Sequence, residues 1–144
     1  MPQQTYQNHT RWYPLFHFVV VPLLALNFLS HLVRFIMNPS VALAFWTLLG
    51  ITLILLALAS RLMALKAQDR VIRLEERLRQ KEVLSPELYA RAQKDLTVGQ
   101  IIALRFAPDE ELGSLVERTL NGEFQKTKEI KQAVKNWRGD YLRV

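Results

Sequence analysis

Two long apolar stretches separated by a short polar connection dominate the first sixty residues. The first, at 15–33, reads LFHFVVVPLLALNFLSHLV and contains no Lys, Arg, Asp or Glu. The second, at 41–60, reads VALAFWTLLGITLILLALAS, and its few hydroxyl side chains can bond to their own helix. At roughly 1.5 Å per residue, each stretch crosses most of a hydrocarbon layer about 30 Å thick. The pattern predicts two transmembrane helices, spanning about 13–36 and 41–62.

The connection between the two stretches is short and carries turn residues. It runs from Arg34 to Ser40 and includes Asn38 and Pro39. Because so short a connection leaves no room for a crossing, the two helices are expected to be antiparallel neighbours. A cleaved signal peptide is the alternative for the first stretch, but no small-x-small cleavage site follows it. We therefore expect a membrane hairpin covering residues 13–60.

Basic residues around the hairpin predict its orientation. Arg11 precedes the first span, and Arg34 is the one basic residue of the connection. A dense series follows the second span: Arg61, Lys66, Arg70, Arg73 and Arg77. Because basic residues near spans stay in the cytoplasm, both termini, including the segment 1–12, are expected there, with these basic residues at the membrane interface. The expected location is a bacterial inner membrane, with the lipid bilayer as the first partner.

Charge divides the chain into an apolar half and a polar half. All 13 acids lie after residue 60, where the chain carries about +4 of its formal charge of +6. A basic excess suits anionic lipid head groups or nucleic acid. The absence of cysteine excludes disulfides, thiolate metal sites and cysteine nucleophiles.

Polar side chains in the first span fall on one side of the predicted helix. At about 100° per residue, Asn27, His31 and Arg34 lie within one arc, together with Ser30. Because polar groups are costly in lipid, this stripe is expected to face the second helix or another subunit. The functional alternative is a redox or proton site. His17 and His31 are about 21 Å apart along a helix and the second span has no histidine, so bis-histidine haem ligation would need a homodimer or a foreign subunit.

The second span continues into a polar helix that carries a narrow apolar seam. No Gly or Pro interrupts residues 61–84, and Ala67, Val71, Leu74 and Leu78 recur at spacings of four, three and four. Three interpretations remain for this segment: packing on its own domain, self-association through the seam, or lying along anionic lipid. Asp69–Arg73 and Glu75–Arg79 are spaced as i,i+4 pairs, which is typical of a solvated face.

Residues 85–144 read as a small helical domain with recognisable helix caps. Ser85-Pro86 begins a helix that reaches about Asp95, and Thr97 with Gln100 forms a capping box for a helix over 98–106. A third helix begins after Pro108 and ends at Asn121-Gly122, and a last one covers about 126–137. The predicted core consists of Leu104, Phe106, Leu112, Leu115, Val116, Leu120, Ile130, Val134 and Trp137. The fold class is therefore all-α: an N-terminal transmembrane helical hairpin followed by a small cytoplasmic helical domain.

Sequence motifs for catalysis are missing. The chain has no G-x-x-x-x-G-K, H-E-x-x-H or G-x-S-x-G pattern and only 5 glycines, so we expect a non-enzymatic protein without catalytic, cofactor-binding or metal residues. Lysines near Trp137 and Tyr141 fit phosphate binding in type, but such a series more often forms the soluble face of a final helix. Nucleic acid is not expected as a partner.

Four segments together resemble one bacterial family. These are QNHTRWYPLFHFVVVPLLALN, ALKAQDRVIRLEERLR, LTVGQIIALRFAPDEELGSLV and IKQAVKNWRGDYLRV. They are similar to a family of small two-span membrane proteins known only as a domain of unknown function. The resemblance implies two spans in a bacterial inner membrane and no activity or site. Where the family has proline after Trp-Arg near the end, this chain has Gly139, which loosens the last turn.

The leading hypothesis is a membrane-anchored scaffold or accessory subunit. Its interaction residues would be Val71, Leu74 and Leu78, and its partner either a second copy or another membrane protein. The alternative is a small redox or proton-handling subunit that uses the intramembrane histidines in a homodimer.

Overall fold

The computed structural model describes residues 4–8 and 12–141, and the chain divides into two compact units. Residues 11–66 form one, here called the hairpin unit, and residues 1–10 with 67–144 form the other, here called the helical module. Every regular element in the described part of the chain is a helix. The all-α prediction is therefore confirmed.

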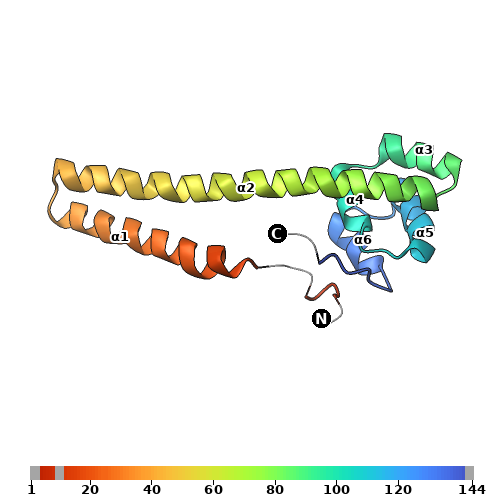
Figure 1. The fold of residues 1–144 in the computed structure, drawn as a ribbon, viewed down its shortest axis with the longest axis horizontal. Coiled ribbons are helices and arrows are strands. Elements are labelled where there is room, and N and C mark those ends of the chain that lie inside the picture. Colours follow the sequence, from red (N-terminus) through yellow and green to blue (C-terminus); the bar gives the residue numbers. More distant parts are fainter. Residues whose placement is uncertain (1–3, 9–11, 142–144) are drawn as a thin grey trace. The chain divides into compact units, whose positions relative to one another are not determined.

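The hairpin unit is built from two antiparallel helices. A π-helical turn, η1 (Leu15–Val20), leads into α1 (Val21–Met37), and α1 runs back along the first part of α2 (Val41–Val83) (Figure 1). Asn38 to Ser40 make the connection, and the Ser40 hydroxyl accepts the Leu43 N–H at 3.2 Å. By length and composition, Leu15–Met37 and Val41–Val83 are long and apolar enough to cross a membrane.

At Gly50, α1 and α2 approach each other closely. A Cβ on this glycine would lie 3.1 Å from the Phe28 Cα, so a larger residue would push the two backbones apart. Closer to the connection, the His31 ring stacks on Trp46, with 5.9 Å between ring centroids and 19° between planes. Residue numbers rise on one helix as they fall on the other, as the short connection predicts.

The first turn of the hairpin is wider than an α-helix. The Val21 N–H donates to the Phe16 carbonyl, five residues back, immediately before Pro22. Proline has no N–H and its ring crowds the carbonyl four residues earlier, so a π-type turn accommodates it without breaking the helix.

The helical module begins with the second part of α2, which continues without interruption to Val83 as the sequence predicts. The chain then forms α3 (Pro86–Asp95), α4 (Val98–Leu104), α5 (Asp109–Leu120) and α6 (Thr127–Ala133) (Figure 1). The Ser85 hydroxyl caps α3, and the reciprocal Thr97–Gln100 box caps α4. Gly122 ends α5 with φ +77°, a conformation that favours glycine. These predicted caps are confirmed.

The module has one apolar core, and it matches the predicted residues. Leu84 and Ala92 join it from the N-terminal side. Of the nine predicted core residues, Leu120 and Trp137 are partly buried, and the others are buried: Leu104, Phe106, Leu112, Leu115, Val116, Ile130 and Val134. The core is therefore small and is shared by α3 to α6 and the end of α2.

The last helix is shorter than predicted. It ends at Ala133 instead of about Trp137, because the following backbone N–H groups bond elsewhere. The N–H groups of Lys135 and Asn136 both donate to the Glu111 carboxylate at 3.0 Å, and the Arg138 N–H donates to the Phe106 carbonyl at 2.8 Å. The prediction was wrong at this end because long-range acceptors replaced the helical ones.

The described N-terminal residues belong to the module. The Gln4 side-chain carbonyl accepts the Asp140 N–H at 2.7 Å, and the Tyr6 ring meets the Trp137 ring edge-on with centroids 6.4 Å apart. The described residues near the two ends of the chain therefore pack in the same unit.

Candidate functional site

Within the helical module, α2 is buried along a face that the sequence reading did not single out. Ile72, Glu76, Gln80 and Leu84 follow one another at intervals of four and are each at most 7% exposed. The predicted seam lies roughly opposite, at about 100° per residue. Val71, Leu74 and Leu78 are 55%, 61% and 58% exposed. The segment does pack on its own domain, but through this second face, which leaves the seam uncovered.

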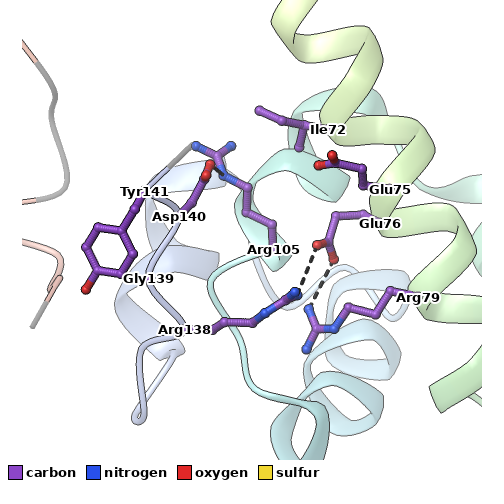
Figure 2. Close-up of a pocket in the computed structure, with 9 residues that line it drawn as sticks. All are labelled: Ile72, Glu75, Glu76, Arg79, Arg105, Arg138, Gly139, Asp140 and Tyr141. Carbon is purple, nitrogen blue, oxygen red and sulfur yellow. Dashed lines mark hydrogen bonds and ion pairs between the residues drawn. The ribbon is translucent and has the colours of Figure 1, made fainter. Parts of the chain in front are cut away.

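A cleft of about 540 Å³ lies beside the buried face of α2. Figure 2 shows Glu76 between the guanidinium groups of Arg79 and Arg138, which lie 3.1 and 3.4 Å from its carboxylate oxygens. Arg105 forms an ion pair with Asp140 at 3.0 Å. The complete lining is Ile72, Glu75, Glu76, Arg79, Arg105, Arg138, Gly139, Asp140 and Tyr141. The cleft thus brings together α2, the end of α4 and the C-terminal segment.

Arg79 joins α2 to the start of α5. Its Nε donates to Asp109 at 2.7 Å, one of its terminal nitrogens donates to the Ala107 carbonyl at 2.7 Å, and the other pairs with Glu76. The predicted Glu75–Arg79 pair is therefore wrong, because Arg79 pairs with Glu76 and Asp109 instead. Glu75 lines the cleft but is exposed, whereas Glu76 is buried.

The charges of the cleft suit a structural role. All three of its arginines are already paired: Arg79 and Arg138 with Glu76, and Arg105 with Asp140. Anion recognition generally needs guanidinium groups that are not already neutralised. This network therefore fastens the C-terminal segment to α2. Sequence reasoning missed it because its partners lie up to 62 positions apart.

Burial raises the pKa of Glu76 above its ordinary value, and the nearby charges of Arg79, Arg138 and Arg105 oppose the rise. A carboxyl whose pKa is higher in the folded state stabilises that state most when it is protonated. Its contribution is complete below the unfolded pKa of about 4.5 and is lost as the pH rises through the folded value.

Replacing Glu76 by glutamine should therefore change the pH profile of the module. We expect the free energy of unfolding of the wild type, minus that of Glu76→Gln, to fall as the pH rises from about 4.5 to neutrality. Hydrogen exchange of the full chain in detergent measures this difference in the free energy of unfolding. Glu117→Gln, at an exposed position, is the matched control. A difference that grows with pH would show that the arginines, and not desolvation, dominate.

The predicted interfacial basic residues follow α2 from the hairpin into the module. Lys66 and Arg70 are exposed, while Arg61, Arg73 and Arg77 are half-buried. None of these five forms an ion pair with another described residue. Their charges are therefore not neutralised within residues 4–8 and 12–141. Arg11, also predicted on this side, lies outside the described residues.

The residues of the predicted polar stripe in the first helix do not all face the same surroundings. His31 faces α2, where it stacks on Trp46, whereas Asn27 and Arg34 are exposed on the outer surface of the hairpin. The Nδ1 atom of His17 lies 3.0 Å from the Tyr13 carbonyl. Among the described residues, no group of three His, Cys, Asp or Glu side chains could hold a metal ion. His31 thus contributes to the packing of α1 on α2.

The aromatic residue near the terminal lysines is part of the fold. Trp137 packs on Phe106, with ring centroids 4.6 Å apart, and the Lys131 Nζ lies 5.6 Å from the Phe106 centroid. Arg138 pairs with Glu76. Trp137 is therefore engaged by the core and does not offer an open surface for stacking on a base.

Comparison with known proteins gives a match to one family model, described as a family of unknown function (DUF6526), over residues 1–144. No curated protein and no solved structure matches.

Proposed function

Since the chain belongs over residues 1–144 to this family of unknown function, DUF6526, we propose a function from its own residues. The protein is an integral membrane protein that holds a small helical module at the surface of a bacterial inner membrane. It acts there without enzymatic activity, as a scaffold or accessory subunit.

Exposed apolar surface on the hairpin supports membrane insertion. The chain buries 0% of the apolar stretch of Leu15–Met37 and 6% of that of Val41–Val83. Leaving large aliphatic side chains in water costs about 1.5–3 kcal/mol each, and soluble monomers rarely expose apolar patches of this extent. A lipid environment removes that cost.

Two observations support a cytoplasmic location of both ends. The segment Gln4–Asn8 and the C-terminal residues pack in the same unit, through the Gln4–Asp140 hydrogen bond. Basic residues also concentrate after the second span, whereas the connection between the spans has only Arg34. Two spans return the chain to the side from which it entered.

Cysteine labelling tests this topology, because the chain has no cysteine of its own. In intact cells, a membrane-impermeant maleimide should label Asn38→Cys in the connection and leave Gln125→Cys in the module unlabelled. Disrupting the membrane should then expose Gln125→Cys to the reagent. Labelling of Gln125→Cys in intact cells would instead place the module outside.

The interaction role rests on one observation, the uncovered seam of Val71, Leu74 and Leu78. In this module α2 has a second face that buries Ile72 and Leu84, so the exposed leucines are not needed for folding. Three large aliphatic side chains in line on a charged helix are typical of a surface that another helix covers. The seam is therefore the proposed contact with a partner.

Charging the seam should release that partner. A C-terminally tagged chain, crosslinked briefly in native membranes and purified in mild detergent, should retain a stoichiometric partner or a second copy. We expect Leu74→Glu with Leu78→Glu to reduce the retained amount at least about tenfold, because two carboxylates would enter an apolar contact. Val98→Glu, which charges an exposed apolar residue elsewhere, is the matched control. Equal retention by all three chains would count against the seam.

A further inference from the structure

The seam is flanked by acids on one side and by arginines on the other. In heptad terms, Val71 and Leu78 occupy a positions, and Ala67 and Leu74 occupy d positions, with Lys81 at the next d. The g positions, just before each a, are Arg70 and Arg77. The e positions, just after each d, include Glu75 and Glu82. The polarity of the flanks is thus the same in both heptads.

These four flanking charges have no partner within the described chain. Arg70, Glu75 and Glu82 are exposed, and Arg77 is half-buried. None of them forms an ion pair or a side-chain hydrogen bond with another described residue, although Glu76 and Arg79 on the same helix are fully engaged. The structure therefore separates the paired charges that hold the module together from these unpaired charges, which are still available.

The arrangement fits a second copy of the same chain. In a parallel two-stranded coiled coil, a g residue lies beside the e residue five positions further along the other strand. Arg70 then meets Glu75 of the second copy, and Arg77 meets Glu82 of the second copy. Two-fold symmetry repeats both contacts, which gives four attractive pairs and no repulsive pair at these positions.

We propose that the protein forms a parallel homodimer through this seam, with the Arg70–Glu75 and Arg77–Glu82 pairs fixing its register. The inference rests on the proposed function, because it names the partner of the same surface. Insertion of both copies in one membrane with the same topology makes their α2 helices parallel. Tethering also raises the effective concentration, which suits a seam of about two heptads, shorter than free coiled coils need.

Disulfide formation reports the dimer directly. Lys81→Cys places the only thiol of the full chain at a d position and leaves the seam intact. Oxidation in native membranes should give a symmetric disulfide dimer, whereas Lys66→Cys, on a different face of α2, should give at least about tenfold less. Equal crosslinking at both positions would indicate random collision and would overturn the proposal.

Charge exchange tests the register in the Lys81→Cys chain. An acidic variant carries Arg70→Glu with Arg77→Glu, and a basic variant carries Glu75→Arg with Glu82→Arg. Each alone should lose crosslinking roughly tenfold or more, because all four contacts become repulsive. Co-expression of the two, with different tags, should restore a mixed dimer. The chain with all four changes, whose net charge is unaltered, should restore self-pairing.

The outcomes separate this proposal from the proposed function. Restored crosslinking in the mixture shows that the single variants fold, so their losses cannot come from misfolding. Equal crosslinking of the acidic, basic and parent chains would overturn the proposed register. Absence of a dimer, with a different stoichiometric partner lost on charging Leu74 and Leu78, would overturn the second copy and leave the proposed function intact. If neither a dimer nor another partner that depends on the seam is found, the homodimer and the proposed function are both overturned.

Discussion

Replacing Arg79 by alanine is expected to destabilise the helical module by about 3–5 kcal/mol, the usual cost of breaking a buried ion pair. The Arg79 side chain is 11% exposed, and that of its partner Glu76 is 7% exposed. The change leaves Glu76 without its nearer cation and leaves the Ala107 carbonyl without its side-chain donor. Hydrogen exchange of the full chain in detergent should show faster exchange throughout α4 to α6.

Two further variants locate the cause of this loss. Arg91→Ala removes an exposed arginine whose hydrogen bond to the Asn121 side chain is 3.5 Å long, so its effect should stay within about 0.5 kcal/mol. Adding Glu76→Gln to Arg79→Ala should recover part of the loss, because the uncompensated carboxylate is then neutral. Strict additivity of the two changes would contradict a direct coupling between these residues.

Replacing Phe106 by alanine is expected to cost about 3–5 kcal/mol, as for other large-to-small changes in a core. Phe106 is the largest fully buried side chain, and its ring contacts Trp137 and the Arg105 guanidinium, which lies 4.3 Å from the ring centroid. Such a loss approaches the whole stability of a small domain. Limited proteolysis of the full chain should then cut within residues 98–141 and spare the hairpin.

The comparison for Phe106 is Phe124, which is half-buried and lies under Arg118 at 4.9 Å. Phe124→Ala should destabilise the module clearly less than Phe106→Ala, because less area returns to water. Phe106→Leu should cost about 1.5 kcal/mol or less, because most of the volume is kept. Equal proteolysis of all three variants would show that the core does not depend on this ring.

Local sequence features predicted most of the secondary structure. Helix caps such as Ser85 and the Thr97–Gln100 box depend on contacts three residues apart, so they can be read directly. The two apolar stretches and the nine core positions follow from side-chain chemistry and periodicity. The charges that flank the seam could also have been found in this way, by assigning heptad positions to residues 67–82.

Tertiary structure decided which face of α2 is covered and where the last helix ends. On periodicity alone Val71, Leu74 and Leu78 are the natural packing face, yet the module covers the face of Ile72 and Glu76. The long-range pairs of Arg79 with Asp109 and of Arg138 with Glu76 select that face. In the same way, the Glu111 carboxylate accepts the N–H groups of Lys135 and Asn136, which would otherwise extend α6. Such choices depend on groups brought together only by folding. A local pattern therefore shows which residues can pack, and the assembled module determines which of them do.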